Sequence, residues 1–184
     1  MALEMQLGGQ PNPRGSNSRS VPPSILAPGN LAVAPSLRNQ KLLAGANARE
    51  FRKMVLLVED SRNLRLVYAA WMARTGFDQG KILQASDLQE AMAHLSAHAG
   101  EIGLVVTDMS YPPQSGQWES RESGIRLIHA VRRMLGESVP ILAMSGDEEN
   151  LPYARQAGAD AALSKTEFIE KFSAIALGLI ETVH

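Results

Sequence analysis

The chain has 184 residues, a hydrophobic fraction of 45%, a formal net charge of -1 and no cysteine. The absence of cysteine excludes disulfides and thiolate metal sites, and it favours a reducing compartment. A net charge close to zero gives no general attraction to nucleic acid or to a membrane surface. No run of about 18 apolar residues is present to span a bilayer, and the N-terminus lacks the layout of a secretory signal. We therefore expect a cytoplasmic protein without membrane insertion and without direct contact to nucleic acid.

Residues 1–50 differ in composition from the rest of the chain. They contain six of the ten prolines and no aromatic residue. Their net charge is +3, from five basic residues less two acidic ones: Arg14, Arg19, Arg38, Lys41 and Arg49 against Glu4 and Glu50. A segment of this composition buries too little apolar surface to offset the entropy lost on ordering. We expect residues 1–50 to form a disordered N-terminal extension, with at most a short helix over 37–51, and residues 51–184 to form one folded domain.

Short apolar segments recur along the chain after residue 50. They read MVLLV, KILQA, IGLVVT, PILAM and DAALS, and they occupy residues 54–58, 81–85, 102–107, 140–144 and 160–164. Mostly continuous apolar segments of this length are typical of strands in a parallel sheet that is covered on both faces. The pattern therefore predicts five parallel strands.

Amphipathic segments lie between these strands and predict helices. The first has apolar residues at positions i, i+3, i+4, i+7 and i+8, namely Leu64, Val67, Tyr68, Trp71 and Met72. Two later segments repeat the helical spacing, with Ile125, Ile128, Val131 and Leu135 in one and Phe168, Phe172, Ile175 and Leu179 in the other. Five strand–helix units in about 130 residues predict a doubly wound α/β domain.

Polar side chains capable of chemistry follow four of the five predicted strands. Glu59 and Asp60 follow the first strand, and Asp108 follows the third. Ser145 and Lys165 follow the fourth and the fifth. In an open parallel sheet, ligands bind in the crevice beyond the carboxyl ends of the strands. The sequence thus predicts that three carboxylates, one hydroxyl and one ammonium group meet at one edge of the sheet.

This combination of groups suits phosphoryl transfer with the help of a divalent cation. Clustered carboxylates repel one another, and oxygen ligands without His or Cys favour Mg²⁺. A carboxylate such as that of Asp108 can attack phosphorus and form an aspartyl-phosphate. Lys165 and Ser145 supply the ammonium and hydroxyl groups that stabilise charge on phosphoryl oxygens. We therefore interpret Asp108 as a phosphoacceptor beside a Mg²⁺ site.

Each of these residues also has an ordinary structural interpretation. Glu59 and Asp60 can cap a helix that begins at Ser61. Asp108 can begin a loop, Ser145 can belong to a turn, and Lys165 can be a solvated side chain. The coincidence of such groups at the same end of four strands favours the functional interpretation.

Two other kinds of site receive less support from the sequence. Glu90, His94 and His98 share one helical face and could bind zinc, but no fourth ligand is evident, so a solvated helix face explains them better. A phosphatase that works through an aspartyl nucleophile would carry a second Asp two residues later, where this chain has Ser110. A hydrolase would also need a substrate-binding cap region, and none is evident.

Four segments together resemble the receiver domain of two-component response regulators. They are VLLVEDS, LVVTDM, PILAMSG and AGADAALSK, and the resemblance extends over residues 53–183. It implies a flavodoxin-like fold with strand order 2-1-3-4-5, and a domain that takes a phosphoryl group from a histidine kinase or a phosphotransfer protein. By position, Asp108 resembles the phosphoacceptor. Ser145 resembles the hydroxyl that moves onto the phosphoryl group, and Lys165 resembles its cationic partner.

The resemblance also implies how Mg²⁺ would be held. Asp60 would bind the ion directly, and Glu59 would bind it through water. Asp108 and the backbone carbonyl of Ser110 would complete the protein's share of the ligands.

Three features depart from the receiver pattern. Thr166 follows the lysine where the family usually has a proline with a cis bond, and a non-proline residue prefers trans by about 2.5–4 kcal/mol. The loop that carries Lys165 could therefore be aimed differently. Ala162 stands where many receivers have an aromatic residue that changes rotamer on phosphorylation. The loop after Asp108 runs sixteen residues to Gly124, about twice the usual span in the family.

The long loop suggests one further hypothesis. Tyr111, Pro112, Pro113 and Trp118 could form a lid or a partner contact that limits access to Asp108. The alternative is a tolerated insertion without a function, and the sequence leaves both open.

We interpret the protein as a stand-alone receiver and a signalling phosphoacceptor, in which only the self-phosphorylation is a chemical reaction. Its output would be contact with a downstream protein that the sequence does not identify. The alternative is a constitutive interaction module with a receiver fold that no longer switches. Thr166 and Ala162 favour that alternative, whereas the acidic residues and Lys165 count against it.

Overall fold

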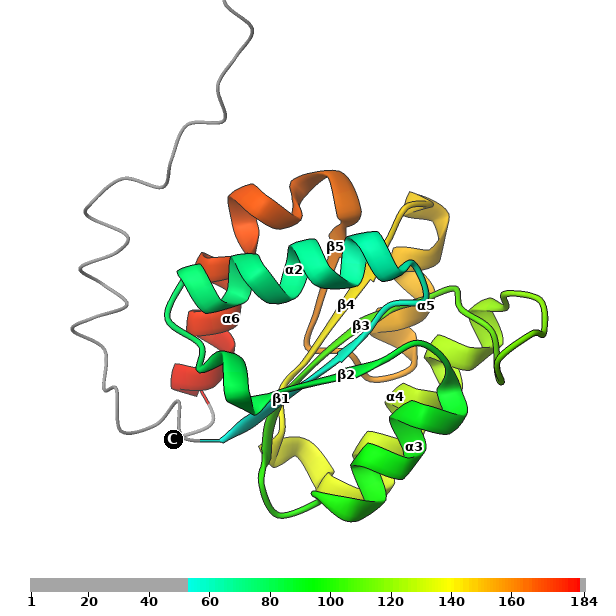
Figure 1. The fold of residues 1–184 in the computed structure, drawn as a ribbon, viewed down its shortest axis with the longest axis horizontal. Helices are drawn as coiled ribbons and strands as arrows, with labels where there is room; N and C mark the ends of the chain where they lie inside the picture. The colour runs from blue at the N-terminus through cyan, green and yellow to red at the C-terminus, as the bar shows by residue number, and fades with distance from the viewer. Residues whose placement is uncertain (1–52, 183–184) are drawn as a thin grey trace, which may run out of the picture. The chain divides into compact units, whose positions relative to one another are not determined.

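The computed structural model describes residues 53–182, and within them five strands form one parallel sheet. The strand order is β2-β1-β3-β4-β5, so the predicted doubly wound, flavodoxin-like fold and its order are confirmed (Figure 1). The strands are β1 (Met54–Val58), β2 (Ile82–Ala85), β3 (Ile102–Asp108), β4 (Ile141–Ser145) and β5 (Ala161–Ser164). The disorder predicted for residues 1–50 and the helix predicted over 37–51 lie outside the described residues.

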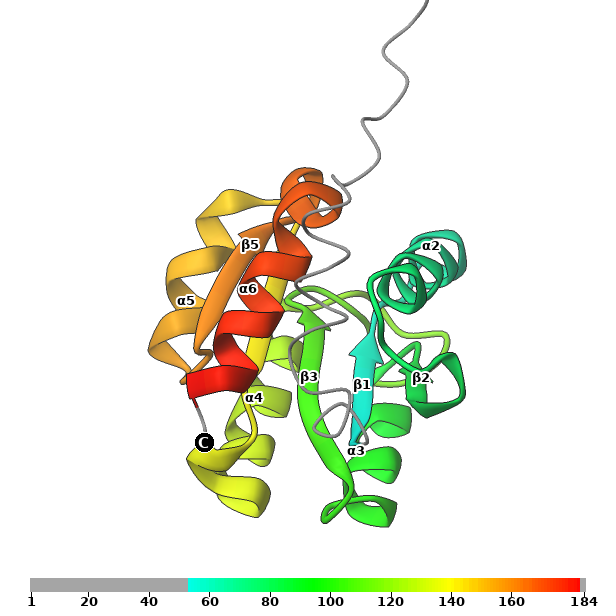
Figure 2. The same ribbon diagram turned by 90° about the vertical axis from the view of Figure 1, so that its left-hand side faces the viewer.

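Helices cover both faces of this sheet. They are α2 (Arg62–Arg74), α3 (Leu88–Ala97), α4 (Arg121–Leu135), α5 (Leu151–Gln156) and α6 (Phe168–Thr182), with short 3₁₀ turns η2 (Gln79–Lys81), η3 (Gly136–Ser138), η4 (Glu148–Asn150) and η5 (Lys165–Glu167). Helices α2 and α6 lie on one face, and α3, α4 and α5 lie on the other (Figures 1 and 2). The fold thus has three layers, with one apolar core on each side of the sheet.

The apolar strands explain this two-sided architecture. Successive side chains of a strand point to opposite faces. In β1, Leu56 and Val58 therefore enter the core under α3 and α4, while Val55 and Leu57 enter the core under α2 and α6. All five residues of β4 are buried. A strand buried on both faces needs apolar residues at consecutive positions, which is the pattern that the sequence shows.

The apolar stripe predicted for residues 64–72 is only partly buried. Tyr68 and Met72 pack into the core, and the Tyr68 ring lies 4.3 Å from that of Phe168 in α6. Leu64 and Val67, by contrast, are 37% and 47% exposed. The reason is geometric, because the first turn of α2 begins beyond the carboxyl end of β1, and Leu64 borders an open polar pocket there.

The long loop after Asp108 is tied down at several points. Tyr111 is fully buried, and its hydroxyl donates to the carbonyl of Ser123 at 3.1 Å. Tyr111 also pairs with Ser120 in an isolated antiparallel bridge. The carbonyl of Pro112 accepts from the N–H of Leu88 at 3.1 Å, which satisfies one free donor at the start of α3.

These contacts correct part of the lid hypothesis. Tyr111 belongs to the core and Pro112 stabilises the start of α3, so neither residue forms a lid over Asp108. Pro113 has the same role as Pro112, because its carbonyl accepts from the N–H of Gln89 at 3.2 Å. Trp118 is 93% exposed and does not line the pocket around Asp108. A partner contact through Trp118 stays a prediction.

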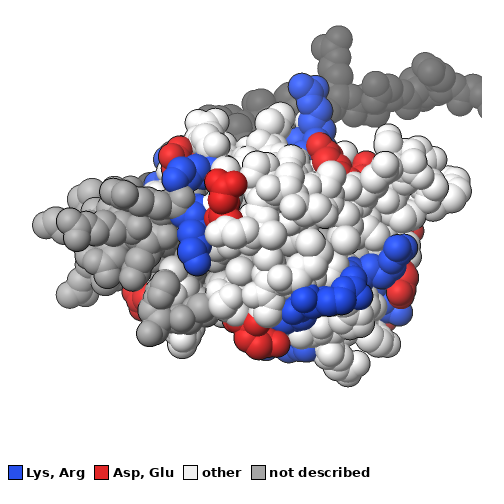
Figure 3. Space-filling model, turned by 90° about the horizontal axis from the view of Figure 1, so that it is seen from below, with Lys and Arg blue, Asp and Glu red and all other residues white. Residues whose placement is uncertain are grey.

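Charged residues of both signs share the surface. On the face shown in Figure 3, Lys and Arg lie close to Asp and Glu, with wide uncharged areas between them. Within residues 53–182, the helices are all too short or too polar to cross a membrane.

Helix α4 approaches the loop after β3 so closely that only glycine fits at residue 124. A Cβ at Gly124 would lie 2.6 Å from the carbonyl oxygen of Met109, which is backbone and cannot move aside cheaply. Gly178 in α6 is also helical, but a Cβ there would meet no atom within 4 Å.

We therefore predict opposite effects for the same substitution at these two glycines. Gly124→Ala should lower the free energy of unfolding by about 1–3 kcal/mol through overpacking. Gly178→Ala should raise it by about 0.5–1 kcal/mol, because alanine loses less entropy in a helix. Urea titration of both variants measures the two changes, and an unchanged midpoint for Gly124→Ala would contradict the close contact.

Candidate functional site

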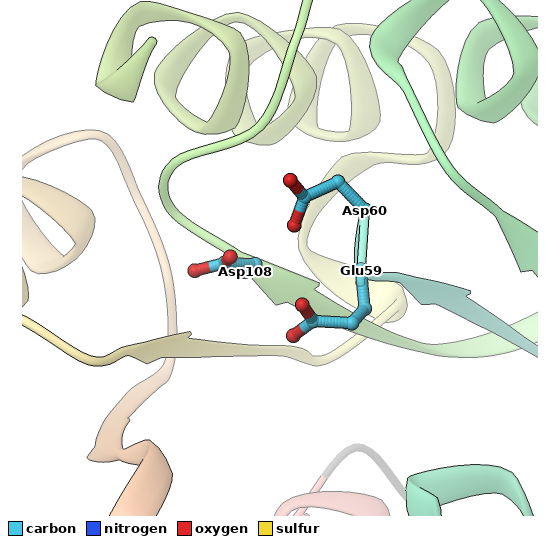
Figure 4. Close-up of side chains that lie close together, drawn as sticks. All are labelled: Glu59, Asp60 and Asp108. Atoms are coloured by element: carbon cyan, nitrogen blue, oxygen red, sulfur yellow. The ribbon is translucent and has the colours of Figure 1, made fainter. Parts of the chain in front are cut away.

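Three carboxyl groups meet beyond the ends of β1 and β3 (Figure 4). One oxygen from each of Glu59, Asp60 and Asp108 lies within 4.8 Å of the others. The register explains this meeting, because Val58 of β1 pairs with Thr107 of β3, so both strands end at the same level. Arg65 of α2 holds the connecting turn by donating to the carbonyls of Glu59 and Asp60, at 2.5 and 3.2 Å.

Lys165 lies against two of these carboxylates. Its Nζ is 2.7 Å from Asp108 Oδ2 and 2.8 Å from Glu59 Oε2. Burial alone would lower the pKa of Lys165, but the nearby carboxylates of Asp108 and Glu59 outweigh that effect and raise it above its usual range. The lysine therefore stays charged and compensates part of the buried negative charge.

Lys165 reaches Asp108 although Thr166, and not a proline, follows it. All described peptide bonds are trans, including the one between Lys165 and Thr166, and the lysine still reaches Asp108. The chain turns at this point through η5, and the hydroxyls of Ser164 and Thr166 lie 3.0 Å apart across the turn.

Asp108 and Glu59 are buried carboxyl groups with raised pKa values. Asp108 is only 3% exposed, and its Oδ1 accepts from the backbone N–H of Met109 at 2.6 Å. Burial nevertheless raises the pKa of Asp108, against the lowering effect of Lys165 and the backbone donors. Burial also raises the pKa of Glu59 to about 7, and the Asp108 charge adds to the rise.

Ser145 begins a chain of polar contacts that leads to the surface. Its buried Oγ accepts from the N–H of Asp147 at 3.1 Å and from Nδ2 of Asn150 at 3.3 Å. Asn150 Oδ1 in turn accepts from Arg121 at 3.1 Å. The Arg121 guanidinium lies 4.1 Å from the ring centre of Tyr153, which is 43% exposed.

The polar groups surround one open pocket of about 290 Å³. All six residues predicted from the sequence line it: Glu59, Asp60, Asp108, Ser110, Ser145 and Lys165. The N–H of Ser110 lies 3.3 Å from Asp108 Oδ1. The tertiary structure therefore brings the whole predicted set together.

The pocket also includes residues that the sequence did not single out. Asn150 comes from η4 and supports Ser145. Glu119 comes from the long loop, and its carboxyl lies beside that of Asp60, whose negative charge raises the pKa of Glu119. No sequence signal marks a loop residue eleven positions after Asp108, because loops have no periodicity that fixes which residue turns inward.

The donor set at this pocket fits Mg²⁺. Three carboxylates supply hard oxygen ligands and leave room for water. Glu59 Oε2 is fully buried, and although Lys165 lies close to it, it accepts no hydrogen bond of normal geometry. A cation beside Asp60 and Asp108 would compensate the negative charge that one lysine leaves unbalanced.

The residues considered for zinc do not form a site. Glu90 Oε2 accepts from the N–H of Ser86 at 2.7 Å, and His94 Nε2 pairs with the carbonyl of Gln84 at 3.1 Å. His98 pairs with Glu101. Among residues 53–182, Glu59, Asp60 and Asp108 are the one group of three or more possible ligands close enough to share a metal ion.

The sequence of residues 55–176 matches the family model of the response regulator receiver domain. The match covers more than half of the chain. The chain belongs to the response regulator receiver family. Receivers are signalling phosphoacceptor domains of two-component systems, and their family commonly binds Mg²⁺ at an acidic cluster like that of Glu59, Asp60 and Asp108. No curated protein matches the chain.

Solved receiver structures share the fold of this receiver. A response regulator receiver domain from Clostridium thermocellum is 19% identical with a TM-score of 0.58, and the match covers 71% of this chain and 95% of that one. The receiver domain of NtrX from Brucella abortus is 22% identical with a TM-score of 0.57, over 70% and 98% of the two chains. A CheY-like receiver from Methanospirillum hungatei is 17% identical with a TM-score of 0.58, over 71% and 95%.

The raised pKa of Glu59 makes a prediction about the stability of this receiver without divalent cations. The pKa rises from 4.5 to about 7 on folding, so between these values the folded state binds more protons than the unfolded state. Proton binding at Glu59 therefore stabilises the folded state. This stabilisation is fully present below pH 4.5 and is lost as the pH rises through 7. Glu59→Gln removes it.

We therefore expect the difference in the free energy of unfolding between Glu59→Gln and the wild type to change with pH. As the pH rises from 5 to 8, it should shift in favour of Glu59→Gln by on the order of 1–3 kcal/mol. Denaturant unfolding in EDTA at both pH values measures the difference. A constant difference between the two proteins across this range would show that burial does not shift the pKa of Glu59.

Proposed function

We propose that Asp108 accepts a phosphoryl group from a histidine kinase or a phosphotransfer protein, and that the protein signals through contacts with a downstream protein. The observation that carries the proposal is the position of Lys165 Nζ, 2.7 Å from Asp108 Oδ2, in a pocket that Glu59 and Asp60 also line. An aspartate with only a structural role would not require Glu59 and Asp60 beside it, because buried carboxylates close together repel one another.

The transfer would be a simple displacement at phosphorus. A carboxylate oxygen of Asp108 forms the new bond to phosphorus, and the bond from phosphorus to the imidazole nitrogen of the donor breaks. The electron pair of that bond leaves with the imidazole. Lys165 neutralises charge on the phosphoryl oxygens from the protein side. Mg²⁺, when bound at Glu59, Asp60, Asp108 and the Ser110 carbonyl, supplies the remaining positive charge.

Phosphorylation would act on the polar chain that begins at Ser145. If the Ser145 hydroxyl moves onto the phosphoryl group, it gives up its contact with Asn150 Nδ2. Asn150 also holds Arg121, which stacks on the half-exposed ring of Tyr153. With Ala162 in place of an aromatic residue on β5, we propose that Asn150 and Arg121 carry the change from the pocket to the surface.

The constitutive module stays the alternative function. The small side chain of Ala162 favours it, because the aromatic residue that reports phosphorylation in many receivers is missing. Asp108→Asn distinguishes the two functions. A switch loses its regulated function in this variant, whereas a constitutive module keeps it.

Incubation with acetyl phosphate and Mg²⁺ tests the phosphoacceptor. We expect intact-mass spectrometry to show the gain of one phosphoryl group on the wild type. The gain should be absent from Asp108→Asn and from the wild type in EDTA. An equal gain on Asp108→Asn would place the phosphoryl group elsewhere. Failure of the wild type to bind beryllofluoride with Mg²⁺ would favour the constitutive module.

Removal of Asn150 tests the polar chain. Asn150→Ala should loosen α5 and the preceding turn without phosphorylation, because Arg121 loses its buried acceptor. Hydrogen exchange in residues 147–157 should then rise toward the level that beryllofluoride produces in the wild type. Glu149→Ala, at an exposed neighbour, is the matched control. If the two variants exchange equally, Asn150 does not couple the pocket to α5.

A further inference from the structure

The far end of the long loop contributes a side chain to the acidic pocket. Glu119 lines the pocket together with Asp60 and Asp108, although it follows Asp108 by eleven residues. Glu119 and Asp60 therefore border the same open space. The other polar residues of the pocket come from strand ends or follow them closely, whereas Glu119 comes from the far end of the loop, just before α4.

The position of Glu119 is fixed by the structure of the loop. The next residue, Ser120, donates its N–H to the carbonyl of Tyr111 at 3.1 Å, and Tyr111 is locked into the core. Ser120 also caps α4, because its Oγ accepts from the N–H of Glu122 at 3.2 Å. Two independent contacts therefore hold the backbone next to Glu119, and the side chain projects from a defined point at the pocket.

The location of Glu119 brings like charges together. Glu59, Asp60 and Asp108 already share this space with one ammonium group, that of Lys165. Glu119 is exposed and contributes no packing, so its placement beside Asp60 has no structural benefit that offsets the repulsion. A divalent cation next to Asp60 would turn this repulsion into attraction.

We propose that Glu119 is an additional carboxylate for the divalent cation, supplied by the extended loop, and that it raises the affinity of the site for Mg²⁺. Protein sites for hard cations are tuned by the number of ligand charges and by their rigidity. This inference rests on the proposed Mg²⁺ site and adds a residue that the three-carboxylate arrangement does not contain.

Calorimetric titration of the full chain with MgCl₂ tests the inference. Glu119→Gln keeps the size of the side chain and removes its charge, and we expect it to weaken Mg²⁺ binding about tenfold, as for other residues that support a metal site. Glu122→Gln is the matched control, because it removes the same charge three residues away and Glu122 does not line the pocket. Both residues are exposed, so both variants should fold.

The results separate this inference from the proposed function. Tenfold weaker binding in Glu119→Gln, with unchanged binding in Glu122→Gln, supports the role of Glu119. Equal affinity in the wild type and Glu119→Gln overturns it, and so does an equal loss in both variants, which would reflect net charge alone. No binding of Mg²⁺ by the wild type would overturn the Mg²⁺ site itself, and this inference with it.

Discussion

The pairing of Lys165 with two buried carboxylates is the interaction on which the site depends. Glu59 and Asp108 are almost fully buried at the ends of adjacent strands, where charged carboxylates are costly unless a cation lies close. One ammonium group contacts both of them. It leaves the pocket with an excess of negative charge, and this excess is the physical basis for the proposal that the pocket binds a divalent cation and accepts a phosphoryl group.

The extended loop after β3 is an integral part of the domain. Tyr111 fills the core, and the carbonyls of Pro112 and Pro113 satisfy free donors at the start of α3. Close contact between Gly124 and Met109 brings α4 against the segment that follows Asp108. Because of these contacts, the loop presents Glu119 in a fixed position at the edge of the pocket. It also places the start of α4 where Arg121 donates to Asn150, a residue that lines the pocket.

Much of the fold and the candidate site could be predicted from the sequence, for reasons that particular residues illustrate. Consecutive apolar residues in β1 and β4 indicate strands buried on both faces, and parallel strands place their carboxyl ends at one edge. The six predicted site residues line one pocket as a result. The exposure of Leu64 and Val67 could not be predicted, because helical periodicity does not say where a helix extends past the sheet. The sequence also left open how Thr166 affects the aim of Lys165, because the preference of Thr166 for a trans bond does not fix the path of a turn.

The sequence by itself thus determined the parallel α/β sheet, its order through the family resemblance, and the identity of the acids and the lysine at its edge. These features follow from local periodicity and from strand ends, which a chain encodes in consecutive residues. Only the tertiary structure decided that Tyr111 is a core residue, that Asn150 and Arg121 connect Ser145 to Tyr153, and that Glu119 lies beside Asp60. Those contacts join irregular segments that are distant in sequence, and their geometry is fixed by packing rather than by any repeating pattern.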